Sequence, residues 1–222
     1  MPDKAAAPDG QAGIYVHDSI INLPEFQVWL LDSRLTIASP DDMPAQSIKK
    51  FTLIANGQHY PFVIDRSHDA LASDRITIKP DDKSLSYFLL AQKYNLSDIT
   101  LVLPMFKGIG FQEGDSVIQI MGRTEVDGEP YPGMDEGEFY EWAIELFKPS
   151  HVVVTLTDAS ETGSPEQYRK SRRQGLSPQE AASEIWEASI LVKQGYSHIA
   201  SFSELEDDDG ELERIWILFA RE

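Results

Sequence analysis

Two adjacent segments decide the fold class that the sequence predicts. The first is Asp135-Glu-Gly-Glu-Phe-Tyr-Glu-Trp-Ala-Ile-Glu-Leu-Phe-Lys148, and the second is Val152-Val-Val-Thr-Leu156. In the first, apolar side chains recur at helical spacing, acidic residues crowd the start and a lysine stands at the end, as the helix dipole favours. The second is a uniformly apolar run, typical of a strand buried on both faces. A helix that leads directly into such a strand predicts an α/β unit.

The alternation of strands and helices extends to both sides of this unit, from residue 75 to the end of the chain. The other expected elements are a strand at 75–79, a helix at 83–95, strands at 99–103 and 116–121, helices from Ser164 and Ser177, and strands at 199–205 and 212–219. Both serines precede a proline and a reciprocal capping residue, Gln or Glu. Strands separated by helices need crossover connections. The sequence therefore predicts a mostly parallel, helix-covered α/β sheet that ends in an antiparallel hairpin.

The residues before 75 follow a different pattern. We expect a loose tail over 1–13 and a β-rich element over 14–74, ahead of the larger α/β domain over 75–222. Asn56-Gly57 lies between two apolar runs and predicts a hairpin, because both residues accept positive φ. Pro61 lies in the second of these runs and has no N–H to donate, so we expect that strand at a sheet edge.

Composition narrows the class of protein. The chain has 222 residues, no cysteine and 37 acidic against 19 basic side chains, a net charge of −18. The lack of cysteine excludes disulfides, thiol catalysis and thiolate metal sites, and it fits a cytoplasmic protein. No stretch approaches the ~20 apolar residues of a membrane span. The acidity disfavours nucleic acid as a partner, since a nucleic acid would have to meet a local basic patch.

The only basic cluster in the sequence is formed by Arg169, Lys170, Arg172 and Arg173. On a helix, residues 169, 172 and 173 share a face. Two interpretations are open: pairing with the abundant carboxylates, within one molecule or between copies, or a site for an anion or a partner. We expect a protein partner or self-association at this face.

The segment 75–222 resembles the class I S-adenosylmethionine-dependent methyltransferases. The likeness rests on Gly110-Phe-Gln-Glu-Gly-Asp115 and the strand after it, on Glu145-Leu-Phe-Lys-Pro149, and on Lys193-Gln-Gly-Tyr196 before the closing hairpin. It implies a Rossmann-like domain that transfers a methyl group from S-adenosylmethionine, bound beyond the strand ends. The residues that the resemblance implies for the cofactor are Asp81, Asp82, Met105, Gly122, Arg123 and Asp158.

The sequence departs from this family where the cofactor loop should be. The family's G-x-G-x-G turn is missing between residues 47 and 74, where Gly57 stands alone. A non-catalytic protein on a degenerate version of the same fold is therefore an open alternative, and no general base is identified. Asp81 and Asp82 also fit a helix start, and the candidates after the later strands also fit ordinary polar loops. No metal site is expected, because neither the histidines nor the acidic run before Gly210 has ligand spacing.

A second resemblance is to the PDZ peptide-binding domain. It rests on Gln112-Glu-Gly-Asp115, on Val117-Ile-Gln-Ile-Met-Gly122, on the helix around Ala143 and on the strand at 152–156. It implies a peptide-binding or scaffold protein. The two resemblances differ at residues 83–95, which form an extended strand in the PDZ interpretation and a helix in the methyltransferase interpretation.

Overall fold

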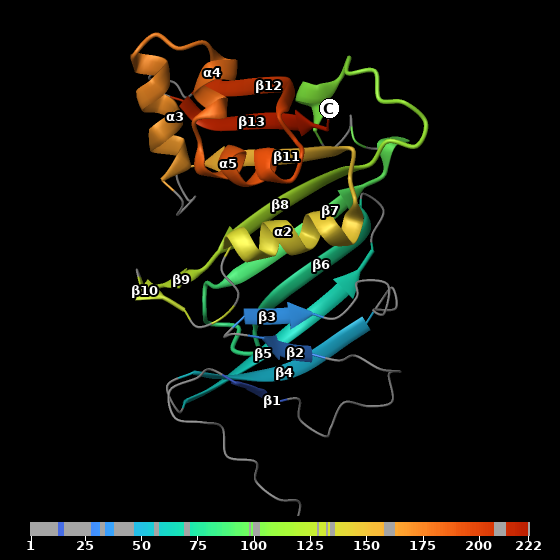
Figure 1. Cartoon of the computed structure of the whole chain (residues 1–222), viewed down its shortest axis with the longest axis vertical. Helices are drawn as coiled ribbons and strands as arrows, with labels where there is room; N and C mark the ends of the chain where they lie inside the picture. The colour runs from blue at the N-terminus through green and yellow to red at the C-terminus, as the bar shows by residue number, and fades with distance from the viewer. Residues whose placement is uncertain are drawn as a thin grey trace, which may run out of the picture.

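The computed structural model shows one large sheet with helices packed on one side of it (Figure 1). The structure describes residues 13–15, 28–31, 34–37, 47–55, 58–68, 72–97, 99, 103–127, 129–131, 133, 136–157, 163–206 and 212–221. The candidate Asp158 and most of the predicted tail lie outside these ranges.

The large sheet has nine strands in the spatial order β1-β4-β5-β6-β7-β8-β11-β13-β12. In chain order they are β1 (Gly13–Tyr15), β4 (Ser47–Ala55), β5 (Gln58–Ser67), β6 (Ala72–Pro80), β7 (Phe88–Tyr94), β8 (Val117–Arg123), β11 (His151–Thr157), β12 (His198–Glu206) and β13 (Leu212–Ala220). Two small hairpins accompany it, β2 (Val28–Leu31) with β3 (Arg34–Ile37), and β9 (Glu125–Val126) with β10 (Glu129–Pro130).

The predicted mostly parallel, helix-covered α/β sheet is wrong. Only β8 and β11 pair in parallel in the nine-stranded sheet, and its other neighbouring strands pair antiparallel. The α-helices after β8 lie on one face. The predicted boundary at residue 75 falls inside β6, and β4 and β5 belong to the same sheet as the later strands.

The error begins at residues 83–95, where the helix predicted from the spacing is the strand β7. Leu89 and Ala91 point into the helix-side core, and Phe88, Leu90 and Gln92 point to the other side of the sheet. Because both sides of this strand carry apolar residues, its sequence also fits helical spacing, and periodicity alone cannot separate the two. Antiparallel pairing with both β6 and β8 satisfies the backbone and decides the outcome.

The strand predicted at 99–103 is also wrong at its described residues. Leu96, Ser97 and Ile99 are helical, and the Leu103 N–H donates to the Ile99 carbonyl at 2.7 Å. The short 3₁₀-helix η2 (Pro104–Phe106) follows. The described residues of this segment pack across the sheet and form no strand of it, so β6, β7 and β8 follow one another without a crossover helix.

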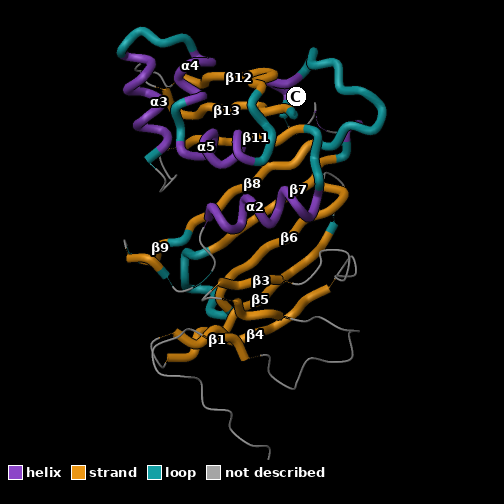
Figure 2. Tube along the Cα trace, in the orientation of Figure 1, coloured by secondary structure: helices purple, strands orange, loops and turns teal. Residues whose placement is uncertain are grey.

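The main core lies between the sheet and four helices, α2 (Glu136–Phe147), α3 (Ser164–Arg173), α4 (Pro178–Ser183) and α5 (Trp186–Lys193) (Figure 2). The predicted helix at 135–148 and strand at 152–156 are confirmed by α2 and β11, and the closing hairpin by β12 and β13. The helix α2 is the crossover between the parallel strands β8 and β11. The remaining three helices connect β11 to β12.

The two serine caps, which were predicted from nearly the same sequence motif, differ in the structure. Ser177 forms the full capping box with Glu180 at the start of α4. Ser164 is buried inside the first turn of α3, where Gly163 with φ +71° occupies the cap position. The Ser164 hydroxyl accepts instead from the Trp186 N–H at 3.3 Å. It thereby satisfies a donor at the start of α5.

Ser177→Ala is expected to lower the free energy of unfolding by about 1 kcal/mol, because it removes one half of a reciprocal cap. Urea unfolding of the two proteins measures the loss. Ser183→Ala is a suitable control, since the Ser183 hydroxyl only donates to a carbonyl inside the same helix. An unchanged midpoint for Ser177→Ala would contradict the cap.

The hairpin predicted at Asn56-Gly57 is confirmed, because β4 and β5 pair with Ala55 opposite Gln58. The edge position predicted from Pro61 is wrong, since β5 lies between β4 and β6. The Pro61 carbonyl accepts from the Asp81 N–H at 2.9 Å, just past the end of β6. A proline is tolerated there because the ladder ends beside it.

Candidate functional site

The residues that the methyltransferase resemblance implies for a cofactor divide between two edges of the sheet. The strands β6, β8 and β11 run in the same direction, so Asp81 and Asp82, just past β6, lie at the same edge as Gly122 and Arg123, the last residues of β8. Met105 lies in η2 at the opposite edge, packed against the cluster around Tyr94 and Val117. The set therefore does not assemble into one site among the described residues.

Asp81 and Asp82 have local partners. The Asp81 carboxylate lies 2.7 Å from Lys50 Nζ. Asp82 Oδ1 accepts from the Ser84 N–H at 2.9 Å and from the Ser84 hydroxyl at 2.7 Å, and the backbone bond is the main reason that the pKa of Asp82 is lowered. The helix start predicted here is instead a turn between β6 and β7. Both carboxylates therefore have partners within the chain, and neither needs the ribose of a cofactor to explain its position.

Gly122 lies beside Glu136, the first residue of α2. A Cβ on this residue would come 2.9 Å from Leu89 Cδ2 and 3.1 Å from Glu136 Cγ. The site needs glycine because other side chains fill the space, whereas a cofactor cradle would leave it open. Arg123, the last residue of β8, has an exposed side chain that points away from the helices.

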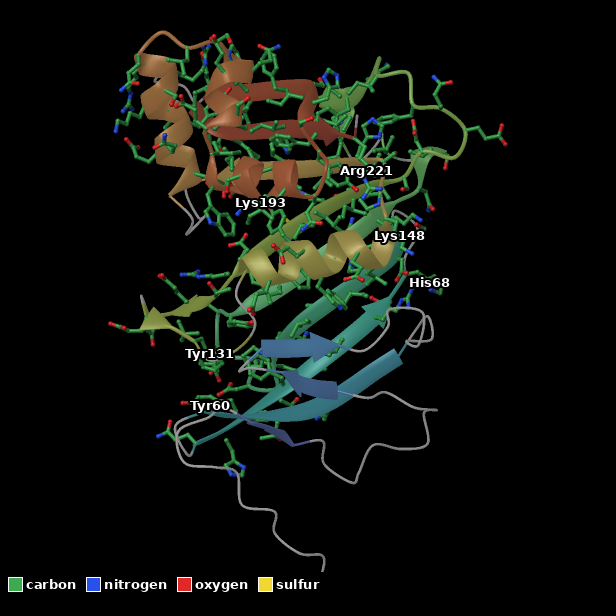
Figure 3. The ribbon with its side chains drawn as sticks, in the orientation of Figure 1. Tyr60, His68, Tyr131, Lys148, Lys193 and Arg221 are labelled. Atoms are coloured by element: carbon green, nitrogen blue, oxygen red, sulfur yellow. The ribbon has the colours of Figure 1, made fainter. Side chains whose placement is uncertain are left out.

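Aromatic side chains pack together at the edge of the sheet that holds Asp81 and Gly122 (Figure 3 labels Tyr60 and Tyr131). The ring of Tyr131 lies 5.6 Å from that of Tyr60, 6.0 Å from that of Phe62 and 5.6 Å from that of Tyr87. Burial raises the pKa of the Tyr131 phenol. The aromatic cluster anchors the loop after β10 against β5.

The basic cluster predicted as a partner site is mostly used inside the molecule. Arg172 Nε lies 3.0 Å from Glu204 Oε1, and the same oxygen accepts from the Tyr168 hydroxyl at 2.7 Å. Arg169 donates twice to the Leu212 carbonyl, at 2.7 and 3.0 Å. Arg173 lies 3.7 Å from Glu166 in an exposed pair, and Lys170 is exposed. The bonds of Arg169 and Arg172 hold α3 against the β12–β13 hairpin. They agree with the interpretation that the cluster pairs with groups of the same molecule.

Ser150 and His151 form a contact that the sequence analysis missed. Ser150 Oγ lies 2.8 Å from His151 Nδ1, donates to the Ser116 carbonyl at 3.0 Å and accepts from the Ser116 N–H at 2.9 Å. Which of the two groups donates in the first bond depends on the tautomer of His151. The contact joins the starts of β8 and β11.

The stability of the fold is expected to decrease as the pH falls below about 6.5, the ordinary pKa of histidine. Burial lowers the pKa of His151, with His198 acting in the same direction and Asp115 opposing them. The unfolded chain therefore binds the proton more tightly, and the contribution of His151, fully present above the unfolded pKa, is lost as the pH falls through the folded pKa. Thermal unfolding between pH 7.5 and 5 measures the slope. His151→Gln should flatten it and the exposed-site control His59→Gln should not; equal slopes would contradict the assignment.

The face of the sheet opposite the helices is covered only at one end by described residues. There the segment 96–111 packs over Tyr94, Val117, Val153 and Leu218. Beyond it, side chains of β5, β6, β7, β8, β11 and β13 point away from the helices with no described element over them. We call this region the open face. In the part of the open face nearest the segment 96–111, polar side chains are joined by hydrogen bonds. The Tyr94 hydroxyl donates to Gln119, Gln119 donates to Thr155, and Arg75 donates to Gln92.

Three cations lie in one row across the open face, which we call the basic row: Lys50, Lys79 and Arg123. Val63 of β5 pairs with both Lys50 and Lys79, and Phe88 of β7 pairs with Arg123. The register Ile78↔Leu89 brings Lys79 next to Phe88. The cations alternate with uncharged residues, so neighbouring cations are two strands, or roughly 9.5 Å, apart. Arg214, which pairs with Thr157, lies on the same side of the sheet, beyond the last pair of β8 and β11, Gln119↔Val153. No stretch of sequence shows this row, because its members are scattered from residue 50 to residue 123.

Comparison with known proteins adds no family to this description: no family model, curated protein or solved structure matches the chain. Among the described residues, no three His, Asp or Glu side chains lie close enough together to hold a metal ion. No helix in the described part of the chain has the length and apolarity to cross a membrane. The open face with its basic row is the best candidate for a functional surface.

Proposed function

We propose that the protein is a non-catalytic binding protein whose macromolecular partner docks on the open face. The observation that carries this proposal is the asymmetry of the sheet. Its helix-side face is buried under four helices, and its opposite face keeps Thr77, Leu90, Met121, Thr155 and Trp216 partly exposed over adjacent strands. A sheet face of this extent, with apolar, aromatic and basic side chains, is typical of an interaction surface.

The contacts elsewhere support a non-catalytic role. The carboxylates, the histidine–serine pair and most of the basic cluster that could have served in catalysis are used in structural bonds. The absence of cysteine supports the cytoplasm as the location. Binding through the open face then needs no cofactor, in agreement with the missing glycine loop.

A matched pair of variants tests the docking surface. Leu90→Glu/Met121→Glu places two charges on the open face, and Ser189→Glu/Val192→Glu places the same charges on the exposed side of α5. A partner captured by the immobilised wild type should be lost with the first variant and kept with the second. Circular dichroism confirms that both variants fold. Loss with both variants, or with neither, would show that the open face is not the docking surface.

Methyl transfer from S-adenosylmethionine is the second candidate function. It is favoured by the parallel pair β8 and β11, joined by α2, since ligands of α/β sheets bind beyond the carboxyl ends of such strands. Calorimetry with S-adenosylmethionine and its demethylated product tests it directly. Heat that saturates with ligand would support the enzyme, and no heat with no thermal shift at millimolar ligand would remove it.

A further inference from the structure

The strand β12 ends the large sheet on the side of the closing hairpin. Figure 1 shows it as the outermost strand, with β13 on one side of it. Among the described residues, no strand pairs with its other side, and no group outside the sheet hydrogen-bonds to the backbone of residues 201–205. The N–H and C=O groups of an edge strand that point away from its neighbour are available to a further strand.

Residues 201–205, Ser-Phe-Ser-Glu-Leu, have few of the features that protect an exposed edge. Natural proteins protect such edges with proline, lysine, bulges or a covering element. This stretch contains neither proline nor lysine, and its pairing with β13 is regular, since the register shifts of β12 lie before Ser201 and after Leu205. Its one charged side chain, Glu204, is held on the helix side by Arg172 and Tyr168. The edge can therefore accept a strand over roughly 16 Å.

The two sides of the sheet differ along this edge. On the helix side, Phe202 lies opposite Ile217 of the core, and α4 packs against the strand. On the side of the open face, the small Ser203 lies opposite Trp216, which is partly exposed, and the side chain of Leu205 is exposed. Opposite residues of neighbouring antiparallel strands lie on the same side of the sheet. An apolar side chain of an added strand therefore has room over Ser203, beside Trp216 and Leu205.

The exposed charges around the C-terminal end of β12 are mostly acidic. Glu206 ends the strand, Glu213 lies at the start of β13, and both side chains are exposed. The sequence between them adds Asp207-Asp-Asp209 and Glu211. Arg214 is exposed nearby, 5.6 Å from the centre of the Trp216 ring. These charges favour a basic partner, whereas a second copy of this chain would bring the same acidic groups and a net charge of −18.

We propose that β12 binds an extended, basic segment of a partner protein, which adds to the large sheet as a further antiparallel strand. Backbone hydrogen bonds to residues 201–205 supply affinity, and side chains on alternate positions supply specificity. An apolar side chain of the segment lies over Ser203 and contacts Trp216. Because the added strand is antiparallel, its N-terminal end lies beside the C-terminal end of β12, where its basic side chains meet Glu206 and Glu213.

Fluorescence anisotropy with a labelled probe peptide, Lys-Lys-Val-Thr-Val-Thr-Val, tests the backbone pairing. Two further peptides carry backbone N-methyl groups, one on its valines and the other on its threonines. A strand at a sheet edge turns the N–H groups of alternate residues toward the sheet. One methylated peptide should therefore bind about tenfold or more weakly than the probe, and the other within about twofold of it. Equal binding of the two methylated peptides would contradict strand addition.

Charge reversal on the protein tests the basic character of the partner. Glu206→Lys/Glu213→Lys should weaken binding of the probe about tenfold or more at low salt. The control Glu141→Lys/Glu145→Lys makes the same change of net charge on the exposed side of α2 and should bind within about twofold of the wild type. Circular dichroism confirms that both variants fold. No binding by the folded wild type at low salt, or equal loss with the two variants, would overturn the proposal.

Two measurements separate this edge from other sites. Analytical ultracentrifugation should show no dimer that the probe dissociates; such a dimer would assign the edge to a second copy of the chain and overturn the proposal. Leu90→Glu/Met121→Glu changes β7 and β8 and should leave binding of the probe unchanged. If this variant abolished binding, the probe would lie on the open face and not on β12. The inference does not depend on the proposed function of the open face, which stands if the probe fails to bind.

Discussion

Phe106→Ala is expected to lower the free energy of unfolding by about 3–5 kcal/mol, the usual cost of truncating a buried phenylalanine. Phe106 ends η2 and is fully buried against Tyr94, Val117, Val153 and Leu218. The described residues of the segment 96–111 contribute no strand to the large sheet. Its attachment therefore depends on side-chain packing, and Phe106 is the most buried of the side chains it contributes.

Urea unfolding of Phe106→Ala and Phe88→Ala measures the difference. Phe88 lies on the same side of the sheet but keeps 37% of its surface exposed. Its truncation removes little buried area, so we expect a loss of less than about 1 kcal/mol. If the two variants unfolded at the same urea concentration, the segment 96–111 would not be packed as the structure has it, and the extent of the open face would have to be redrawn.

The sequence predicts best those elements whose pattern is set by their own residues. The helix α2 has an apolar stripe, an acidic start and a basic residue after its end, and β11 is a short uniform apolar run. The β4–β5 hairpin follows from two residues that accept positive φ. In each case the local signals agree, and the structure follows them.

The predicted fold class is wrong because of the segments whose structure depends on strands that are distant in the sequence. Residues 88–94 fit a helix by spacing and form a strand because β6 and β8 flank them on both sides. Residues 99–103 fit a buried strand by composition, yet described residues there are helical and lie across the sheet. The methyltransferase-type order depended on a crossover helix at 83–95 followed by a parallel strand at 99–103. Neither element forms, so the sheet has no parallel crossover there.

The basic row also depends on strand pairing between residues that are distant in the sequence. The cluster that is visible in the sequence, on α3, uses Arg169 and Arg172 to hold the closing hairpin. The basic row draws one residue from each of three strands, β4, β6 and β8, and only the strand order and register bring them level.

Gly122→Ala is expected to lower the free energy of unfolding by about 1–3 kcal/mol, as overpacking in a tight interior does. Its Cβ would lie 2.9 Å from Leu89 Cδ2 and 3.1 Å from Glu136 Cγ. Leu89 is completely buried and cannot turn aside without displacing the core beneath α2. The helix must move away from β8, and packing is lost along the crossover that joins the two parallel strands.

Gly110→Ala is the matched control, because a Cβ there would meet only Gln112 Nε2, at 4.0 Å. Thermal unfolding of both variants, combined with calorimetry in S-adenosylmethionine, separates the two roles that Gly122 has been given. If Gly122 is a packing residue, its variant unfolds at a temperature several degrees lower and Gly110→Ala does not. If Gly122 instead lines a cofactor site, its variant keeps the wild-type stability and loses a heat of binding that the wild type shows. The contact distances favour the first result, since the space that a cofactor would need beside Gly122 is already occupied by Leu89 and Glu136.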